Sequence, residues 1–573
     1  MEGTPSMPHA PPTPIKALWP DSASRQTLSL SPQPPPPANT SVYTGGLPTP
    51  IKAHRLRHHL HHIGYNIQLT NYLVDGFLEG FSIGNSAEVE DIWGPNSRHV
   101  RQNATVVADK LETEILAGRI VGPFNDPPFS PFHISPLNVR PKKSPNKYRL
   151  LHNLSYPYDG NSINSNIPAH RKTVQYASVG DAISGLLTLP RHSYTAKTDI
   201  ADAFRLIPVH PTDYPKLGMR FRGKYYYDRN LPQGCSSSCQ IFEAFSTALH
   251  SILVAYDSDI TCVHMLDDFF LMSADHNSCA AHLRLLLDLC DDIGVPMSPE
   301  KTTTPCQNTT FLGVELDTNL QIAKLPLAKL QEYSTEVRAT SLRSKIRRKE
   351  LESLVGKLNF AASVVPARPF LRRLIDLIHT VDKPYHYIRI TQCVKQDLLT
   401  WLDFLMHYNG ITYFRSLNKA DPETMHMVSD ASKLGFGACF GSKWLQAEYP
   451  ASWQEHHITI LELYPIFVLI NIFGGLMKNS TILFHCDNSA VTAIINKQSS
   501  KDRTAMTIVR PLVLFLVQHN ICLRSKHIPG VLNVLSDKIS RFQVTPSLLR
   551  DHGMDAVQTP IPRHLLPINY ILG

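Results

Sequence analysis

The sequence of 573 residues predicts a multidomain α+β protein, and three observations support this fold class. Residues 119–317 contain short apolar runs broken by Pro, Gly and Asn, with helix-like segments between them. Residues 318–420 change to helical periodicity. Residues 421–543 again alternate strand-like and helix-like segments, which indicates a second α/β unit. The hydrophobic content of 43% is that of an ordinary globular protein.

The chain begins with a segment, residues 1–53, that is rich in Pro, Ser and Thr. We expect a disordered tail, because such a composition cannot bury enough apolar surface to order itself. The hexapeptide PTPIKA occurs at 12–17 and again at 48–53. It is either a docking motif or a chance duplication. The N-terminus has no apolar run of the signal-peptide type, so we expect an intracellular protein of the cytoplasm or nucleus, neither secreted nor in a membrane.

Residues 54–118 are expected to form a helical N-terminal region. The stretch HRLRHHLHH at 54–62 concentrates histidine and arginine. A solvated basic helix face is favoured over a metal or nucleic-acid site, because no Cys or carboxylate partner accompanies it. A further helix is expected over 105–118, ending at Gly118.

Helical spacing dominates residues 318–420, the next region of the chain. Its clearest apolar stripe follows a basic run, SLRSKIRRKE, at 341–350. This basic run is either a solvated face or a contact with a phosphate backbone, and the sequence leaves both open. The stripe consists of Leu351, Leu354, Val355, Leu358 and Ala362.

Charge and composition narrow the class of partner. The net charge of +8 permits an anionic partner such as nucleic acid. The ten cysteines lack zinc-ligand spacing, so we expect reduced thiols in the core. The longest apolar run, LYPIFVLINIFGGLM at 463–477, is expected to be a buried helix, because it is short for a bilayer and contains Pro465 and Asn471.

Three acidic residues lie in strand-like surroundings. Asp199 ends the segment YTAKTD, and Asp267 and Asp268 stand between apolar flanks in HMLDDFFLM, which predicts a hairpin with the acids at its tip. If the strand of Asp199 lies beside that hairpin, the carboxylates repel one another unless cations neutralise them. Hard oxygen ligands select Mg²⁺, with Mn²⁺ as an alternative. Two such ions about 3.5–4 Å apart clamp the attacking and leaving oxygens of a phosphoryl transfer.

The ordered set of Asp199, LPQG at 231–234 and the Asp-Asp pair resembles the palm of a reverse transcriptase. LPQGCSSSCQIFEAFSTAL at 231–249 and SPLNVRPKKSPNKYRLLHNLSYP at 135–157 are similar, more narrowly, to DIRS-type retrotransposon polymerases, the tyrosine-recombinase class. The resemblance implies a right-hand polymerase. It places fingers and a ferredoxin-like palm in 119–317 and a helical thumb and connection in 318–420.

The resemblance also implies roles for single residues. Asp199, Asp267 and Asp268, with the carbonyl of Ile200, would bind the catalytic metals. Phe204 would crowd the sugar 2′ carbon and so select deoxynucleotides. Met265 departs from the family, which usually has an aromatic residue there. Other matching positions would grip the triphosphate (Lys142, Arg149), line the nucleotide pocket (Gln233, Gly234), donate a proton to pyrophosphate (Lys301) or support the primer end (311–317).

A second set of acids follows in residues 421–543. Glu462 lies in an apolar helix, where a carboxylate needs compensation. The order Asp, Glu, Asp, Asp on this strand–helix pattern resembles a ribonuclease H, which implies two Mg²⁺ ions that activate water to cut the RNA of a hybrid. Residues 544–573 are expected to be a short tail. The matching positions are Asp430, Glu462, Asp487 and Asp537, with His527 as a residue that helps product release.

Together the two resemblances imply an RNA-directed DNA polymerase with ribonuclease H activity. Its partners would be an RNA template, a DNA primer, dNTPs and the RNA–DNA hybrid. The rival hypotheses are a domesticated, catalytically weak or silent protein that binds hybrids, and a ribonuclease H alone. We find no protease motif, and a separate recombinase or integrase is expected to perform integration. The sequence leaves the oligomeric state, the template and the primer open.

Overall fold

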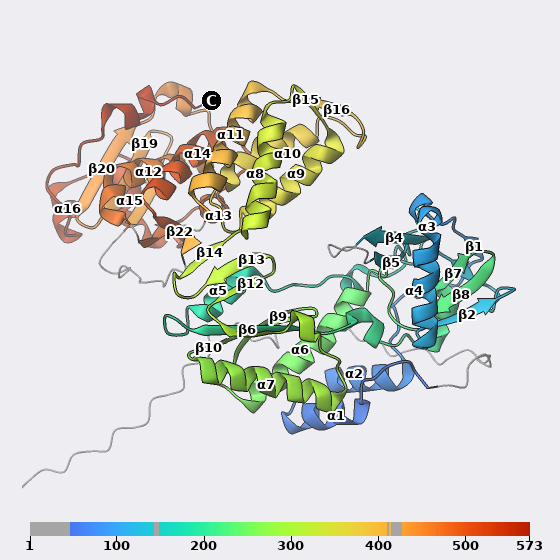
Figure 1. The fold of residues 1–573 in the computed structure, drawn as a ribbon. Coiled ribbons are helices and arrows are strands. Elements are labelled where there is room, and N and C mark those ends of the chain that lie inside the picture. Colours follow the sequence, from blue (N-terminus) through green and yellow to red (C-terminus); the bar gives the residue numbers. More distant parts are fainter. Residues whose placement is uncertain (1–45, 142–147, 410–411, 414–426, 479, 573) are drawn as a thin grey trace, which may run out of the picture.

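The computed structural model describes residues 46–141, 148–409, 412–413, 427–478 and 480–572. Figure 1 shows the elements up to α7 (His276–Ile293) in one lobe and the elements from α8 (Leu327–Ser341) onward in a second lobe. The strands from β12 (Asn308–Phe311) to β14 (Ile322–Lys324) lie between them. All ten cysteines are free, and most of them are buried, as expected. Lys142 and the first copy of PTPIKA lie outside the described residues.

The second copy of PTPIKA is packed against the body of the protein. Ile51 is buried, and the hydroxyl of Thr49 donates a hydrogen bond to the carbonyl of Leu206 (2.7 Å). The backbone N–H of Lys52 bonds the carbonyl of Ile293 (2.7 Å). The expectation of disorder is therefore wrong for residues 46–53. Residues 1–45 lie outside the described part of the chain.

The histidine-rich helix α1 (Ala53–His62) packs with α2 (Ile67–Glu79). His59 is buried between the hydroxyl of Tyr256 and Asp292, whose carboxylate lies 2.7 Å from Nε2. Arg55 donates to the same carboxylate at 2.9 Å. The helix face is thus only partly solvated, because α7 supplies the carboxylate partner that the local sequence lacks.

The part of the chain that precedes α5 (Val179–Leu186), together with β7 and β8, contains a five-stranded sheet in the order β1-β3-β7-β8-β2 and the hairpin β4–β5. It joins elements from the predicted helical region 54–118 to elements from the region 119–317, where the fingers are expected. α4 packs beside β2 and begins and ends close to the predicted helix. The elements are β1 (Ile92–Trp93), α3 (Arg98–Gln102), α4 (Ala104–Leu116), β2 (Ile120–Phe124), β3 (His133–Ile134), β4 (Leu137–Pro141), β5 (Tyr148–His152), β7 (Gly218–Phe221) and β8 (Lys224–Asp228).

The palm sheet has the order β11-β6-β10-β9 and is covered on both faces. Phe269 and Leu271 of β10 lie in the core with α6 and α7, whereas Phe270 and Met272 lie in the core with α5. Burial on both faces explains why this strand is continuously apolar. The elements are α5 (Val179–Leu186), β6 (Tyr194–Asp199), α6 (Ser238–Tyr256), β9 (Thr261–Met265), β10 (Asp268–Ser273), α7 (His276–Ile293) and β11 (Thr303–Cys306).

The expected helical region contains four α-helices and several short strands among its described residues. Leu351, Leu354 and Leu358 are buried on one face of α9, as the apolar stripe predicts. A small sheet, β12-β13-β14-β17, joins this region to the palm. The elements are β12 (Asn308–Phe311), β13 (Val314–Asp317), β14 (Ile322–Lys324), α8 (Leu327–Ser341), β15 (Lys345–Arg347), α9 (Arg348–Ala361), α10 (Arg372–Ile378), β16 (Tyr387–Arg389), α11 (Gln392–His407) and β17 (Thr412–Tyr413).

The last region is a five-stranded sheet in the order β20-β19-β18-β21-β22. The pairs β18–β19 and β19–β20 are antiparallel, whereas β18–β21 and β21–β22 are parallel. Helices α12 and α14 pack on each other. The elements are β18 (Met427–Ala431), β19 (Gly435–Phe440), β20 (Lys443–Glu448), α12 (Ile458–Phe473), β21 (Thr481–Cys486), α13 (Ser489–Lys497), α14 (Arg503–Gln518), β22 (Cys522–His527), α15 (Val534–Ser540) and α16 (Pro546–Asp551).

One segment of this region, Ile458–Met477, is long and apolar enough to cross a membrane when judged by length and composition. It is longer than the run of 463–477 that the sequence suggested. Within the fold, 72% of its most apolar window is buried. The segment therefore packs as the core helix α12, as expected.

Residues 544–572 pack back onto the same domain rather than forming a free tail. Leu565 is buried in the core around α12, and its carbonyl accepts a hydrogen bond from the hydroxyl of Tyr464 (3.0 Å). The ring of Tyr570 lies 5.0 Å from that of Tyr464. The backbone N–H of Thr559 bonds the carbonyl of Trp444 (2.9 Å). This segment therefore completes the domain's core.

Candidate active site

Three carboxylates meet at one end of the palm sheet. Asp199, the last residue of β6, pairs directly with Asp268, the first residue of β10. Asp268 also pairs with Met265 across the tight turn that joins β9 to β10, and Asp267 lies in that turn. The backbone N–H of Ile200 donates to the carbonyl of Asp267 (2.9 Å), which joins the end of β6 to the turn. The predicted hairpin with acids at its tip is confirmed.

The three acids are poorly compensated by the protein alone. Burial, reinforced by the charge of Asp199, raises the pKa of Asp267 to about 6. Burial also raises the pKa of Asp268. The ammonium of Lys301 lies 2.5 Å from Oδ1 of Asp199, so one cation already enters the cluster. A site that holds ionised acids this closely fits divalent cations bound through oxygen ligands.

The turn is held from behind by Glu243, a residue that sequence reasoning missed. Leu266 adopts a left-handed conformation (φ 54°), and its N–H donates to Oε2 of Glu243 (2.9 Å). The other oxygen of Glu243 lies 3.4 Å from Nε2 of His264. Glu243 comes from α6, so a carboxylate in the otherwise apolar stretch IFEAF was the available signal.

The LPQG turn is fixed by close backbone contacts. Gly234 has φ 143°, and a Cβ there would lie 1.9 Å from the carbonyl oxygen of His152, so no other residue fits. The carbonyl of Gln233 accepts the N–H of His152 (3.0 Å). Asn164, also missed from sequence, donates to the carbonyl of Gly234 (2.8 Å) and accepts from the N–H of Ser236 (2.9 Å).

The remaining candidates of the polymerase site that fall within the described residues lie on separate elements. Phe204 is half-buried in a short 3-10 helix, Ala203–Leu206, and packs edge-on against Phe242 of α6 (5.6 Å between ring centroids). Arg149 is exposed on β5, opposite Arg140 of β4. The 311–317 stretch forms the predicted hairpin of β12 and β13.

A second group of acids converges in the last domain. Asp430 lies on the central strand β18, next to β21, which ends one residue before Asp487. Glu462 projects from α12, and its carboxylate, that of Asp487 and the thiol of Cys486 lie within 4.8 Å of one another. Three of the four expected acids thus lie close enough to interact: burial, and after it the charge of Asp487, raises the pKa of both Asp430 and Glu462.

This group also lacks sufficient partners within the protein. Oε2 of Glu462 and Oδ1 of Asp487 are buried without a hydrogen-bond partner among the described residues. Burial, with the charges of Asp487 and Asp430, raises the pKa of Glu462 to about 7. Burial raises the pKa of Asp430 to about 6, although the hydroxyl of Ser540 (2.5 Å) opposes the shift. Buried carboxylate oxygens without a hydrogen-bond partner are suited to binding cations.

The fourth acid and the histidine stand further out. Asp537 on α15 is half-exposed and accepts from Nε of Arg541 (2.8 Å). Its charge acts on Asp430. His527 is exposed at the end of β22, and its Nε2 lies 3.1 Å from the backbone carbonyl of Asp487. Asn488 caps α13, with Oδ1 accepting the N–H of Ala490 (2.9 Å).

Comparison with known families agrees with the palm geometry. Residues 140–316 match the family model described as reverse transcriptase (RNA-dependent DNA polymerase). The chain contains a reverse transcriptase domain. This domain covers all three palm acids, LPQG and Lys301, and it ends within β13.

Viral and transposon proteins are similar to the reverse transcriptase domain and, in part, to regions beyond it. Protein P of duck hepatitis B virus is 25% identical over 181 residues, which is 31% of this chain and 21% of that protein. The retrovirus-related Pol polyprotein from transposon opus of Drosophila melanogaster is 22% identical, covering 75% of this chain and 41% of that protein. The enzymatic polyprotein of carnation etched ring virus is 19% identical over 56% of this chain and 47% of that protein. The chain thus spans less than half the length of each.

Solved structures of a foamy viral protease-reverse transcriptase also resemble the chain. A complex with double-stranded DNA has 16% sequence identity and a TM-score of 0.46, covering 87% of this chain and 84% of that one. A complex with an RNA/DNA hybrid has 16% identity and a TM-score of 0.45, covering 87% and 64%.

Proposed function

We propose that this chain is an RNA-directed DNA polymerase that extends a DNA primer on an RNA template. The observation that carries the proposal is the meeting of Asp199, Asp267 and Asp268 at the tip of the palm sheet, within the reverse transcriptase domain. These three carboxylates carry more negative charge than the nearby protein cations neutralise, so they are suited to binding two Mg²⁺ ions. The ions would stabilise the attacking 3′-oxygen and the leaving pyrophosphate.

The chain's own residues then have separable tasks. β6 and β10 hold two of the acids in register, and the hairpin turn places Asp267 beside them. The short helix carrying Phe204 presents an aromatic ring where a nucleotide sugar would lie. Lys301, whose ammonium lies 2.5 Å from Asp199, would deliver a proton to a departing phosphate oxygen. Arg149 offers a guanidinium to the triphosphate.

We propose ribonuclease H activity for the last domain. Its sheet has three antiparallel strands followed by parallel β21 and β22, and Asp430, Glu462 and Asp487 meet at it. The orphaned oxygens of Glu462 and Asp487 support two bound Mg²⁺ ions, which would activate a water molecule against the RNA strand. Asp537 completes the set from α15, and His527 lies at the exposed edge to assist product release.

A mobile element of the DIRS type is the source we propose, on the basis of the motifs at 135–157 and 231–249. The RNA template, DNA primer, dNTPs and RNA–DNA hybrid are the proposed partners, in the cytoplasm or nucleus. A separate recombinase or integrase would insert the product.

Primer extension tests the polymerase proposal. The full chain with Mg²⁺, dNTPs and a DNA primer on an RNA template should give extended DNA, and a labelled hybrid should be cut. Asp267→Asn should abolish extension and spare cleavage, whereas Asp487→Asn should do the reverse. A well-folded protein that binds hybrids but performs neither reaction would instead support the domesticated, silent alternative. Loss of both activities in each variant would contradict two separate sites.

A further inference from the structure

A small sheet in the second lobe presents a basic and aromatic face away from both acid clusters. β15 and β16 pair antiparallel, with Ile346 opposite Ile388 at their centres. These two isoleucines are buried, so alternation along each strand turns the remaining side chains to solvent. Figure 1 places both strands at the end of this lobe remote from β14. The outward residues are Lys345, Arg347, Tyr387 and Arg389.

The side chains on this face are already ordered around Tyr387. The ammonium of Lys345 lies 4.9 Å from its ring centroid and the guanidinium of Arg347 lies 5.4 Å from it. Nε of Arg347 also donates to the hydroxyl of Tyr387 (3.2 Å). Cations packed on an aromatic ring are held in place, so their side chains lose little conformational freedom when a ligand binds.

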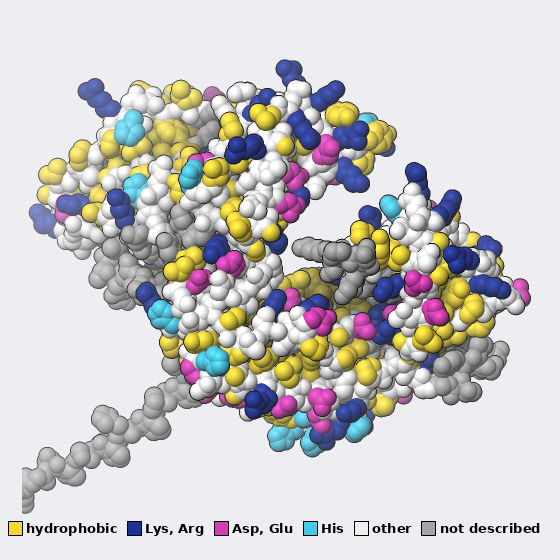
Figure 2. Space-filling view, in the orientation of Figure 1, with side chains coloured by type: hydrophobic (Ala, Val, Ile, Leu, Met, Phe, Trp, Pro, Cys, Tyr) yellow, Lys and Arg dark blue, Asp and Glu magenta, His cyan; other side chains and the backbone are white. Residues whose placement is uncertain are grey.

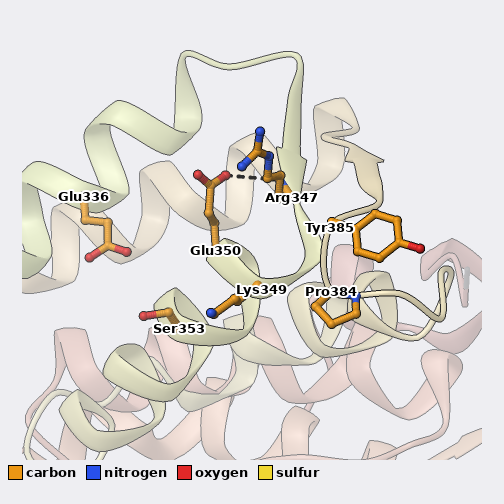
Figure 3. A pocket seen from close by; sticks show the side chains of 7 residues that line it. All are labelled: Glu336, Arg347, Lys349, Glu350, Ser353, Pro384 and Tyr385. Carbon is orange, nitrogen blue, oxygen red and sulfur yellow. Dashed lines mark hydrogen bonds between the residues drawn. The ribbon is translucent and has the colours of Figure 1, made fainter. Parts of the chain in front are cut away.

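A pocket continues this face toward α8 and α9. Figure 3 shows Lys349 between Ser353 on one side and Pro384 on the other, with the ring of Tyr385 at the rim. Tyr385 is 67% exposed, and Tyr387 is 53% exposed. Two accessible aromatic rings therefore stand within one cationic surface.

The two acids that line the pocket are already paired. Glu336 accepts from Lys357 (2.5 Å), and Glu350 lies 3.6 Å from Arg343. Figure 2 shows Lys and Arg side chains gathered at this end of the lobe. Three cations have no carboxylate within ion-pair distance in the part of the chain that the structure describes: Lys345, Lys349 and Arg389.

We propose that this surface, formed by β15, β16 and the adjoining pocket, binds single-stranded RNA. Cations without a carboxylate partner can bind the phosphate backbone of a nucleic acid. Exposed tyrosine rings and the planar guanidinium of Arg347 can stack on unpaired bases, which a duplex does not expose. The choice of RNA rests on the proposed function, since an unpaired template strand is the single strand that such a polymerase must handle. The surface would hold that strand outside the palm.

Equilibrium binding tests this inference separately from catalysis. The full chain is first saturated with an unlabelled blunt RNA–DNA hybrid, and a labelled, unstructured RNA oligonucleotide is then titrated by fluorescence anisotropy at several salt concentrations. Lys345→Ser with Arg389→Ser should weaken binding about tenfold and lower the salt slope by about 1.4, since each phosphate contact on a single strand contributes about 0.7. Tyr385→Ser should weaken binding about fivefold with an unchanged slope.

Arg550→Ser with Arg563→Ser removes two exposed cations elsewhere and is the matched control. Unchanged RNA affinity in the β15–β16 variants, or an equal loss in the control, would overturn the inference. The inference would also be overturned if Lys345→Ser with Arg389→Ser weakened binding of a polyglutamate peptide as much as binding of RNA while Tyr385→Ser had no effect on RNA binding. Single-stranded DNA is titrated in parallel, and tighter binding of this DNA than of RNA would contradict the choice of RNA.

Primer extension by the same variants should stay normal at saturating primer–template. A failure of the RNA-binding inference would therefore leave the polymerase proposal standing.

Discussion

At the residue scale, Glu462 is a buried carboxylate whose charge the rest of the protein does not neutralise. Its carboxylate projects from a helix that is buried nearly all round, beside Asp487 and within the field of Asp430. One of its oxygens has no hydrogen-bond partner among the described residues. The cluster therefore favours either a proton or a cation, and pH decides between them.

The pH dependence of stability follows from this pKa. The folded pKa of Glu462, about 7, lies above the ordinary value of 4.5, so its contribution to stability is present at low pH and lost as pH rises through 7. The metal-free chain should lose about 1–2 kcal/mol from its last domain between pH 5.5 and 8, allowing for partial exposure. Calorimetry measures this, with Mg²⁺ expected to restore stability at pH 8. An equally steep loss in Glu462→Gln would contradict the assignment.

Phe204 is the second residue whose role can be isolated. Its ring packs against Phe242 and is only partly buried. Phe204→Ala should open space beside the sugar and raise ribonucleotide incorporation at least about tenfold. Competition between ribonucleotides and deoxynucleotides during primer extension measures the change. Phe204→Tyr keeps the bulk and serves as the control, and unchanged selectivity in the alanine variant would refute the role.

At the scale of elements, the palm hairpin depends on α6. Leu266 holds a left-handed backbone conformation, which costs about 1–3 kcal/mol unless its surroundings enforce it. Glu243 enforces it by accepting the Leu266 N–H at 2.9 Å. The helix therefore positions Asp267 through the backbone without touching the reacting groups.

Glu243→Ala should lower the kcat of primer extension about tenfold with little change in the KM for dNTPs, because the acids lose their alignment while the nucleotide contacts remain. Glu243→Gln retains an acceptor for the Leu266 N–H and should keep activity within about threefold. Steady-state extension assays on both variants, with thermal melting to check folding, give the answer. Equal effects of the two substitutions would show that the charge, and not the hydrogen bond, matters.

The elements also show which structural features can be predicted from the sequence. Asp267 and Asp268 are adjacent in a hairpin, so local pattern alone predicts their placement, and the stripe of α9 predicts its buried face. Glu243 and Asn164 act through contacts between segments far apart in the chain. The apolar stretch IFEAF marks Glu243 as unusual but does not show what it contacts, and no local pattern distinguishes Asn164 from an ordinary polar residue. The packing of residues 46–53 against α7 escaped prediction for the same reason.

For the whole molecule, the two lobes carry their acid clusters in separate cores. The helical region meets the last domain through Asp397, which is buried and lies 3.0 Å from Arg373 and 3.9 Å from Arg510. Side chains of α14 also pack against the core of the helical region. The hydrogen bonds and core contacts of the C-terminal segment within the described residues, in contrast, are with the last domain.

Deleting residues 544–573 should therefore damage cleavage and spare synthesis. The deletion removes Leu549, Leu565 and Tyr570 from apolar contacts, a loss of about 5 kcal/mol at about 1.5–2 kcal/mol for each side chain. Hybrid cleavage should be lost and the melting transition of the last domain should fall, while primer extension persists. The milder variant Tyr570→Ala should cost about 2 kcal/mol. Loss of extension in the truncated chain would contradict independent cores.

The same C-terminal packing sets an order of events during synthesis of the protein. A ribosome adds about 5–20 residues each second, and N-terminal domains generally fold first. The reverse transcriptase domain, complete by β13, can fold while later codons are still being read. The last domain has to wait until Leu565 and Tyr570 have left the exit tunnel. If the two proposed activities hold, a nascent chain would thus acquire the means to copy RNA before it acquires the means to destroy it.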